Sequence, residues 1–522
     1  MIQSMNYVTN KAGRKIPEEI NGEPVIPYMG VGGYRPSGNR YGPPVSSCRD
    51  YPPDGNKLVD SLREALERSG LRDGMTISTH HHFRNGDLLA NQVFDLAHEM
   101  GVRGLRWFPS ASFPCHAHLI PYLEDGTIER IEGSMNGPLG KFVSEGKMKG
   151  TGVLRSHGGR YQALQDGEVN IDIAVIGAPT ADPFGNANGL YGSSACGSLG
   201  FALADSRYAD KVIIVTDHQV DFPCIPWQIH GNDVDYVVKV DKLGDPAQIV
   251  SGTTRITRSP DRLLLAELTA RFCDAAGIIK NGFSFQSGAG GTSLAVGEYF
   301  KQIMKEKGIR ARFARGGSNR YLVSMLEEGL IDYLLDGQTF DLEGVRSLAE
   351  NPNHVWTSPF TSYNYHGKGN FAGLVDVVIL GATEVDMQFN ANVVTHSDGY
   401  LLHGIGGWQN CLFSKTVILP IPLFRDRIPV LRERVTTLCG PGELIDVIVT
   451  ERGIAINPLR EDLIEATKNS ALPLKTMEEL KAEADRICGK PYGPLLDDRV
   501  VAVVKWVDGT VLDSVNQVQS TL

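Results

Sequence analysis

The sequence predicts an α/β fold made of two homologous domains, each with a mainly parallel sheet flanked by helices. The first observation is an internal repeat: residues 171–189 read IDIAVIGAPTADPFGNANG, residues 375–393 read VDVVILGATEVDMQFNANV, and seven of nineteen aligned positions are identical. The second is the regular alternation of strand-like and helix-like segments, which is typical of βαβ units. The third is that the strand-like segments are continuously aliphatic, as in sheets that helices cover on both faces.

The repeat continues beyond these segments in the same order. At the same offset of 204 residues, Gly200 aligns with Gly404 and the strand 211–215 aligns with 415–419. We therefore expect an N-terminal arm (1–45), a first domain (46–255) and a second domain (256–522). The boundary is expected near Ser251–Pro260, just before a helical pattern at 261–277.

The arm and the segment after it are rich in turn-forming residues. Residues 27–55 contain six glycines and six prolines, a composition that does not suit a helix or an interior strand. We expect this segment to wrap around the body or a neighbouring subunit, or to cover an active site. Glycine makes up 58 of the 522 residues, which indicates many tight turns and close backbone approaches.

The first domain is predicted element by element. A helix is expected at 58–70, with Asp54 or Asn56 as its N-cap and Gly70 at its end. Residues 74–83 are expected to form a strand, 85–101 a helix and 102–109 a second strand. These alternating elements begin the parallel sheet of this domain.

Three consecutive histidines lie at the end of the first of these strands. Alternate residues of a strand share a face, so His80 and His82 are expected to point together and His81 away. No nearby cysteine or carboxylate pair completes a metal-binding set, and we expect no metal. The imidazoles are expected to line a polar pocket or to be hydrogen-bonded at the strand end.

Charge and composition exclude several classes of protein. The chain has 51 basic and 61 acidic residues, and a net charge of −10 gives no general attraction to nucleic acid. No apolar run approaches the roughly 18 residues that a membrane span needs, and no secretion signal is visible. The eight cysteines form no CxxC pair, so we expect reduced thiols and a cytoplasmic protein. Complete GxGxxG, P-loop, HExxH and GxSxG motifs are absent from the sequence, which argues against the corresponding chemistries.

Three loops at the expected carboxyl ends of strands can carry chemistry, because ligands of parallel sheets bind there. Gln286–Thr292 precedes a helical pattern whose first N–H groups can receive an anion or an oxyanion. In His403–Asn410, adjacent glycines allow the main chain to donate hydrogen bonds to a thioester oxyanion. Arg312–Arg320 combines cations with hydroxyl and amide donors, which suits carboxylate binding. Each loop is also compatible with a plain turn that binds nothing.

These motifs resemble those of the CoA-transferase superfamily. The two repeat segments are similar to its paired segments, QSGAGGTSLAV at 286–296 resembles its glycine turn, and HGIGGWQN at 403–410 resembles its GxGG loop. VIVTERGIA at 447–455 resembles a late strand that is common there. Over about residues 50–515 the chain most resembles the alpha subunits of citrate lyase, which are citrate:acyl-carrier-protein transferases.

The resemblance implies an activity and its partners. An acyl-carrier protein would be transferred from its acetyl thioester to citrate, giving a citryl thioester and acetate. The thioester would be formed by a CoA-like prosthetic group on the acyl-carrier partner, with CoA as a surrogate, and this chain would bind no cofactor tightly. The implied partners are the beta subunit and the gamma (acyl-carrier) subunit, in an oligomeric complex.

The same resemblance suggests roles for individual residues. Catalytic roles are expected for the glycines of the GxGG loop, Gly404, Gly406 and Gly407. Binding of the thioester or the pantetheine arm is expected of Gln286, Gly288, Gly290, Gly291, Asn390 and Asn392. The two asparagines are equally compatible with Asx-type turns that contact no ligand. The carboxylates of citrate are expected to bind Arg315, Ser318, Arg320 and Arg84.

One departure from the superfamily bears on the mechanism. Many CoA-transferases carry a nucleophilic Glu after the glycine turn and its following strand, but here no Glu lies between Arg310 and Met325. We therefore expect a ternary complex in which a citrate carboxylate attacks the acetyl thioester and gives a mixed anhydride. Three alternatives stay open: a citramalate transferase, an acyl-CoA hydrolase or acetate CoA-transferase with a nucleophile such as Glu384, and a non-catalytic assembly subunit.

Overall fold

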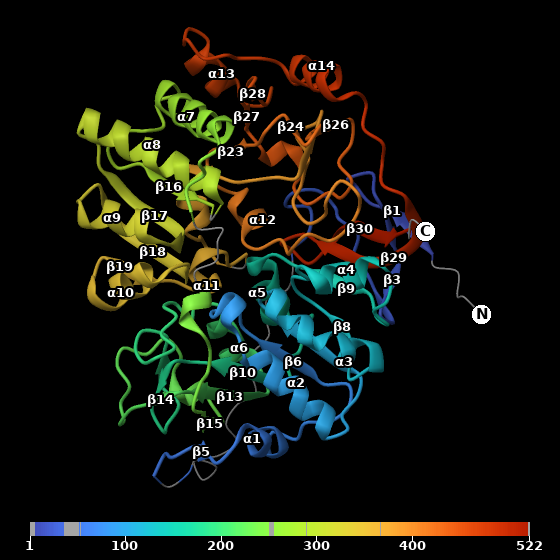
Figure 1. The fold of residues 1–522 in the computed structure, drawn as a ribbon, viewed down its shortest axis with the longest axis vertical. Coiled ribbons are helices and arrows are strands. Elements are labelled where there is room, and N and C mark those ends of the chain that lie inside the picture. The colour runs from blue at the N-terminus through green and yellow to red at the C-terminus, as the bar shows by residue number, and fades with distance from the viewer. Residues whose placement is uncertain are drawn as a thin grey trace.

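The computed structural model describes residues 6–35, 52, 54–249, 255–288, 290–365 and 367–519. Two large sheets, each flanked by helices, lie in the lower and upper parts of the molecule in Figure 1. The lower part is built from the first half of the chain and most of the upper part from the second half (Figure 1). The predicted α/β class with mainly parallel sheets is confirmed.

The first sheet has seven strands, and all of its pairs are parallel. In spatial order the strands are β5 (Leu58–Val59), β15 (Tyr236–Lys239), β13 (Lys211–Thr216), β10 (Ile173–Gly177), β6 (Thr76–Thr79), β7 (Leu105–Pro109) and β8 (Ile128–Ile131). The helices of this half are α1 (Leu62–Arg68), α2 (Leu89–Glu99), α3 (Ile120–Asp125), α4 (Pro138–Ser144), α5 (His157–Asp166) and α6 (Ala202–Tyr208). The strand order reverses between β6 and β10, which places a crevice at their carboxyl ends.

The second sheet has eight strands, all parallel except for the last pair. Their order is β19 (His354–Trp356), β18 (Ile331–Thr339), β17 (Ala311–Ser318), β16 (Ser284–Ser287), β20 (Val377–Ile379), β23 (Val417–Pro420), β27 (Val447–Thr450) and β28 (Gly453–Ile456). The accompanying helices are α7 (Pro260–Ala275), α8 (Gly291–Lys307), α9 (Arg320–Glu327), α10 (Leu342–Glu350), α11 (Pro359–Ser362), α12 (Trp408–Cys411), α13 (Glu461–Thr467) and α14 (Met477–Cys488). The order reverses between β16 and β20, the counterpart of the reversal in the first sheet.

The repeat also recurs in two small sheets beside the large ones. β11 (Thr180–Ala181) pairs with β12 (Ala187–Asn188) and β14 (His218–Gln219), while β21 (Glu384–Asp386) pairs with β22 (Ala391–Asn392) and β26 (Leu431–Arg432). In both sheets the first pair is antiparallel and the second parallel. A short hairpin, β24 (Phe424–Arg425) and β25 (Ile428–Pro429), belongs to the second half alone.

The two ends of the described chain meet on the first half. The C-terminal hairpin of β29 (Leu496–Lys505) and β30 (Val511–Val518) pairs in parallel with β9 (Gly152–Leu154). The N-terminal strands β1 (Tyr7–Thr9), β2 (Lys15–Pro17), β3 (Glu19–Ile20) and β4 (Glu23–Pro24) lie beside this hairpin in Figure 1. The predicted division at 255/256 stays a prediction, since residues 250–254 lie outside the described residues.

The hydrophobic core accounts for the continuously aliphatic strands, because both faces of the second sheet are buried. In the second sheet, Val378 and Leu419 belong to a large cluster that also contains the core of the first half. Their neighbours Val377 and Ile418 belong to a separate cluster beneath α7, α8 and α9. Alternate side chains of these strands are thus buried on opposite faces of the sheet.

Two local predictions are wrong. The first helix begins at Leu62 rather than Leu58, because Leu58–Val59 pairs with β15 as an edge strand. Its N-cap is Ser61, whose hydroxyl accepts a hydrogen bond from the Glu64 N–H, and not Asp54 or Asn56. The segment 315–318, predicted as a loop, continues strand β17 through a register shift at Gly316/Gly317.

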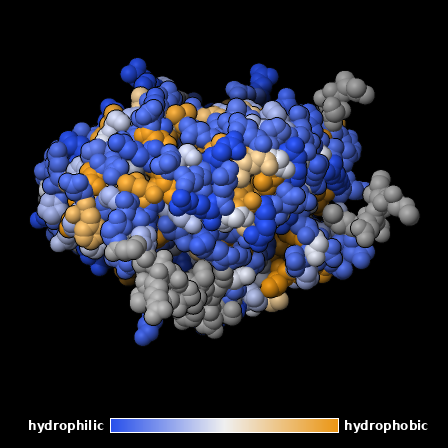
Figure 2. All heavy atoms as spheres, turned by 90° about the horizontal axis from the view of Figure 1, so that it is seen from below, coloured by the Kyte–Doolittle hydropathy of each residue, from blue (hydrophilic) through white to orange (hydrophobic). Residues whose placement is uncertain are grey.

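Among the described residues, no helix is long and apolar enough to cross a membrane. The face seen from below the view of Figure 1 is mainly hydrophilic, with apolar side chains in separate areas (Figure 2). Over the described ranges, no cluster of three or more His, Cys, Asp or Glu residues could hold a metal ion.

Candidate active site between the two halves

A cavity of about 550 Å³ lies where the carboxyl ends of strands from both halves face each other. His81 and Arg84, which follow β6, line one side, while Gln286 at the end of β16 and Gly316 in β17 line the other. This is the position in which a parallel α/β sheet binds ligands, beside the reversal of strand order. The predicted loops therefore converge on one cavity.

Seven of the predicted site residues line this cavity directly. They are Arg84, Gln286, Gly288, Gly290, Gly404, Gly406 and Gly407. Gly291 lines an adjoining pocket that shares Gly288 and Gly290 with the cavity. Gly290 of the glycine turn and Gly404 of the GxGG loop, 114 residues apart in the sequence, are thus brought together.

Two glycines of the GxGG loop, Gly404 and Gly407, have no room for side chains. A Cβ atom on Gly404 would lie 2.2 Å from Ser134 Cβ, and one on Gly407 would lie 2.6 Å from the Tyr363 hydroxyl. Gly406 has φ +62°, a conformation that L-residues rarely adopt, and its carbonyl accepts a hydrogen bond from the His157 N–H at 2.7 Å. The loop therefore presents bare main chain to the cavity.

Helix α8 begins at the same cavity. Gly290 is its N-cap and supplies no side-chain hydrogen bond. The first main-chain hydrogen bond of the helix runs from the Leu294 N–H to the Gly290 carbonyl, so the N–H groups just before it have no partner within the helix. Such N–H groups favour an anion or a developing oxyanion.

Arg84 is the principal cation of the cavity. Its side chain is 8% exposed and lies 5.3 Å from the Phe113 ring and 4.9 Å from the Phe340 ring. Burial lowers the pKa of Arg84 to about 10, so the guanidinium remains charged at neutral pH. Its φ of 51° lies in the left-handed region, a strained conformation for a side chain of this kind.

Neutral imidazoles line the same cavity. The His81 ring lies 5.4 Å from the His157 ring, nearly parallel to it, and His81 Nδ1 is 2.6 Å from the Ser110 hydroxyl. Burial lowers the pKa of His81 well below its ordinary value, and burial with the nearby Arg160 charge lowers that of His157 to about 3. Burial also lowers the pKa of His403. These rings can therefore donate one hydrogen bond each without carrying charge.

A second arginine in the lining is paired with two carboxylates. Arg155 is 3.4 Å from Glu132 and 2.9 Å from Glu168, and both carboxylates lie outside the cavity lining. Among the described residues that line the cavity, none is Asp or Glu. The site therefore offers a positive charge, main-chain donors and neutral polar groups, but no carboxylate.

The structure places the predicted carboxylate ligands of the third loop elsewhere. Arg315 is 1% exposed and donates a hydrogen bond to Gln286 Oε1 at 2.6 Å, with its guanidinium 4.9 Å from the Tyr363 ring. Ser318 is buried and donates to Asp336, and Arg320 is exposed on α9 beside Asp341. Around the described cavity, none of these three is part of the lining. Because Arg315 lies on a buried strand and not on a loop, it supports Gln286 from behind.

The repeated asparagines hold turns. Asn390 donates to Asp386 at 3.2 Å and accepts from the Gly442 N–H at 2.9 Å. In the first half, Asn186 makes the equivalent hydrogen bonds: it donates to Asp182 at 2.8 Å and accepts from the Gly231 N–H at 2.9 Å.

Asn392 is fully buried and donates to Glu384 and to Thr395. Glu384 is fully buried as well, 3.3 Å from Arg432, and does not reach the described cavity lining.

Several lining residues escaped the sequence analysis. His157, Asn136, Gln338 and Tyr363 all line the cavity. His157 is the first residue of α5 and follows the N-cap Ser156, so a helix start was the available signal. Asn136, Gln338 and Tyr363 lie outside the repeat segments and carry no motif.

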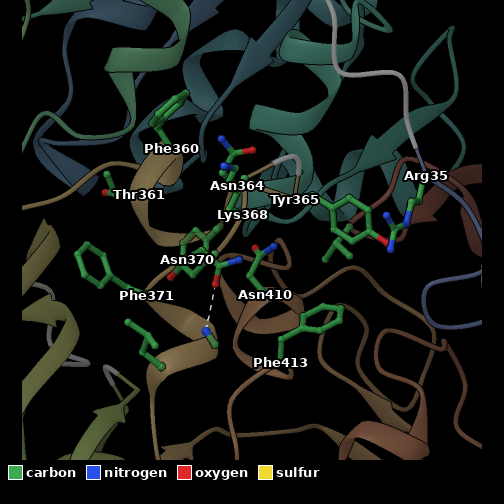
Figure 3. Close-up of a pocket in the computed structure, with 16 residues that line it drawn as sticks. Arg35, Phe360, Thr361, Asn364, Tyr365, Lys368, Asn370, Phe371, Asn410 and Phe413 are labelled. Atoms are coloured by element: carbon green, nitrogen blue, oxygen red, sulfur yellow. Dashed lines mark hydrogen bonds between the residues drawn. The ribbon is translucent and has the colours of Figure 1, made fainter.

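A third, open pocket of about 1060 Å³ borders the cavity at Tyr363. Figure 3 shows its aromatic side chains, among them Phe360, Phe371 and Phe413, with Arg35 at one end. The dashed line in Figure 3 is the hydrogen bond from the Gly373 N–H to Asn370, at 3.0 Å. None of the predicted site residues lies in its described lining.

Known proteins resemble the chain over most of its length. The family model "Citrate lyase, alpha subunit (CitF)" matches residues 55–518. The citrate lyase alpha chain of Klebsiella pneumoniae is 44% identical over 467 residues, which cover 89% of this chain and 92% of that protein. A solved citrate lyase alpha subunit from Streptococcus mutans, in complex with citrate, has a TM-score of 0.91 and 40% identity over 98% of this chain and all of that one. A Pseudomonas malonate decarboxylase chain shares the fold alone, with a TM-score of 0.58 and 19% identity over 84% of this chain and 94% of that one.

Proposed function

This chain belongs to the citrate lyase alpha-subunit family, and from that premise we propose that its central cavity binds citrate beside the thioester of an acyl-carrier partner. The family makes the chain a transferase within a multi-subunit citrate lyase complex. In the proposed reaction, the carrier moves from an acetyl thioester to citrate, and acetate is released.

One observation carries the proposal: the described lining of the cavity combines Arg84 with two glycine loops and contains no carboxylate. A trianionic substrate is favoured by a buried guanidinium and is not repelled by any lining group. The citrate that accompanies the Streptococcus mutans relative supports the same substrate class.

The first step forms a mixed anhydride. A carboxylate oxygen of citrate attacks the acetyl carbonyl carbon, a C–O bond forms, and the C–S bond breaks to leave a thiolate on the carrier. The negative charge that develops on the thioester oxygen would be stabilised by main-chain donors of the GxGG loop and the start of α8. Arg84 would hold another carboxylate of citrate during this step.

The second step regenerates the thioester. The carrier thiolate attacks the citryl carbonyl of the anhydride, a new C–S bond forms, and acetate leaves as the C–O bond breaks. No net proton is consumed or released, which agrees with imidazoles that stay neutral near pH 7. The chain's contribution is orientation and charge stabilisation, since the described cavity offers no carboxylate that could act as a covalent nucleophile.

The partners and the cofactor follow from this chemistry. We propose that the acyl donor is a gamma (acyl-carrier) subunit whose CoA-like prosthetic group enters the cavity, and that a beta subunit cleaves the citryl thioester. The chain itself would bind no cofactor tightly, and acetyl-CoA would serve as a surrogate donor. The glycine-lined cavity supports this proposal, because bare main chain allows a thin pantetheine arm to approach closely.

Mass spectrometry of acyl exchange tests the proposal. The full chain is mixed with acetyl-CoA and citrate, with citramalate in a parallel reaction. We expect citryl-CoA and acetate, with no acylated or CoA-bound protein. Loss of acetyl-CoA without a citryl product would identify a hydrolase, a protein-bound thioester would identify a carboxylate nucleophile, and no reaction with any donor would favour an assembly subunit. The citramalate reaction separates the two substrate specificities.

A further inference from the structure

A second pocket, of about 370 Å³, continues from the cavity on the side of the second half. It shares Gly288, Gly290, His403, Ile405 and Trp408 with the cavity, so the two spaces meet at the glycine turn and the GxGG loop. This is the place where the proposed function puts the thioester. A donor whose thioester lies in the cavity can therefore extend into this second pocket.

The walls of the pocket suit a thin chain of methylene and amide groups. Val393, Pro420 and Ile421 form apolar walls, and Gly291 and Gly381 expose main chain. A Cβ atom on Gly291 would lie 2.7 Å from the Arg255 carbonyl, so this wall tolerates no side chain. Apolar side chains and exposed peptide groups together match the alternating character of a pantetheine arm.

The part of the pocket that the cavity does not share contains two arginines. Arg262 lies in the first turn of α7, and Arg425 lies in β24. Arg425 is fixed in place, because its guanidinium donates to the carbonyls of Ala382 at 2.7 Å and Thr383 at 2.8 Å. No ion pair within 4.0 Å of Arg262 or Arg425 occurs among the described residues.

The two positive charges lie close enough to repel each other. Burial, with the Arg262 charge as the next cause, lowers the pKa of Arg425 to about 10. The carboxylates that act on Arg262 are those of Asp261 and Glu451, and the buried carboxylate of Glu384 acts on Arg425. Among the described residues that line the pocket, none is Asp or Glu, while Thr292, Ser293 and Thr383 add hydroxyl groups. Two adjacent guanidinium groups without a lining carboxylate are the arrangement that binds a phosphate.

We propose that Arg262 and Arg425 bind a phosphate of the acyl donor's prosthetic group, while the pantetheine arm fills the pocket between them and the thioester. This inference rests on the proposed function and adds to it the residues that select a phosphorylated donor. Arg425 would hold a fixed position, and Arg262, which is half-buried at the start of α7, would close on the phosphate from the other side. A phosphate at this end would relieve the repulsion between the two arginines.

Calorimetric binding of CoA and of pantetheine to the full chain tests the inference, because the two ligands differ in phosphate and nucleotide while sharing the arm. We expect Arg262→Gln to weaken CoA binding about ten-fold or more, the effect of one lost charge-assisted hydrogen bond, and to leave pantetheine binding unchanged. Arg271→Gln is the matched control, since Arg271 lies on the same helix and pairs with Glu267 on the surface. Arg425→Gln is tested in parallel, with thermal unfolding to show that the variant is folded.

Two results would overturn the inference: Arg262→Gln binds CoA as tightly as the wild type, or it weakens CoA and pantetheine equally. Wild-type protein that binds pantetheine as tightly as CoA would overturn it as well. These outcomes do not depend on catalysis. A wild-type chain that binds CoA through the arginines but forms no citryl thioester would instead contradict the proposed function.

Discussion

Replacing Arg84 by Met should stabilise the folded protein and abolish its use of citrate at low concentration. Arg84 is 8% exposed, and burial lowers its pKa from the ordinary value of an arginine to about 10. Since one pKa unit corresponds to about 1.4 kcal/mol, the buried charge destabilises the folded state by about 3 kcal/mol at neutral pH. This cost is present in full below pH 10 and shrinks as the pH rises towards 12.5, because the folded-state pKa is the lower one.

Two ring contacts of Arg84 reduce the expected gain. Its guanidinium lies near the rings of Phe113 and Phe340, and each cation–π contact is worth about 0.5–1 kcal/mol. Met keeps a long apolar side chain against these rings and leaves the backbone strain unchanged. The net gain in the free energy of unfolding is therefore about 1–2 kcal/mol, seen as a higher Tm in thermal unfolding.

Citrate affinity should change in the opposite direction. A lost pair of charge-assisted hydrogen bonds costs about 3 kcal/mol, which weakens citrate binding about 100-fold. At citrate concentrations 100 times the wild-type Kd, binding adds about 2.7 kcal/mol to the wild type but only about 0.4 kcal/mol to the variant. Citrate titration in the thermal assay therefore separates the two proteins clearly.

The control is Arg320→Met, which removes an exposed arginine beside Asp341 on α9. We expect its citrate response to stay within about two-fold of the wild type, since a rim-exposed charge contributes little. The reasoning is refuted if Arg84→Met is less stable than the wild type and citrate still raises its Tm by the wild-type amount. A loss of citrate response in Arg320→Met alone would move the tricarboxylate site to the third loop.

Three further predictions follow from particular contacts. Gly404→Ala should reduce the steady-state rate of acyl transfer about 100-fold, because its Cβ would lie 2.2 Å from a side-chain carbon of the opposite half. The control Gly297→Ala should leave this rate unchanged, because nothing lies within 4 Å of that Cβ. Glu384→Gln should lower Tm, because it disrupts the buried ion pair with Arg432, while the folded fraction of the protein keeps its kcat. A large loss of kcat in fully folded protein would restore Glu384 as a candidate nucleophile. Burial lowers the pKa of His116, but the hydrogen bond to Asp87 at 2.9 Å outweighs this effect and raises the pKa to about 9. The stabilising effect of the pair should therefore be complete below pH 6.5 and disappear as the pH rises through 9. An equal Tm difference between wild type and His116→Asn at pH 6 and pH 10 would contradict this.

The sequence was sufficient to predict the duplication, because a repeated strand and turn impose the same hydrogen bonds twice. Asp182 with Asn186 and Asp386 with Asn390 form the same turn, and each asparagine then accepts from a distant glycine N–H. The same pattern left two interpretations of the asparagines open, a turn and a ligand contact, and the observed hydrogen bonds are those of a turn that fixes the fold of each half. A single site needs groups that differ between the halves.

Where sequence reasoning failed, tertiary burial determined the outcome. Arg315 and Ser318 have the composition of a polar loop, but pairing with β16 and β18 extends the strand through them and turns Arg315 towards Gln286. His81, by contrast, lies on the side that alternation predicted, although β6 ends at Thr79 and the histidines follow it: His80 and His82 stack together at 5.5 Å, while His81 lines the cavity. The local sequence pattern thus predicted the direction of these side chains, whereas long-range packing decided which of them reach the cavity.

The duplicated glycines explain how two similar halves make one site. Gly200 is packed against the second half, where its Cβ would lie 1.9 Å from the Thr357 carbonyl, and its counterpart Gly404 is packed against Ser134 of the first half. Each glycine therefore anchors its loop to the opposite half. The loops then differ: Ala202 begins helix α6, whereas the corresponding Gly406 lies in a turn that lines the cavity and α12 begins only at Trp408. In the first loop the N–H groups of Ala202 and Leu203 donate to the carbonyls of Leu199 and Gly200. In the second loop, no main-chain hydrogen bond from the N–H of Gly406 or Gly407 occurs among the described residues, so of these two loops the second is the one that can stabilise an oxyanion.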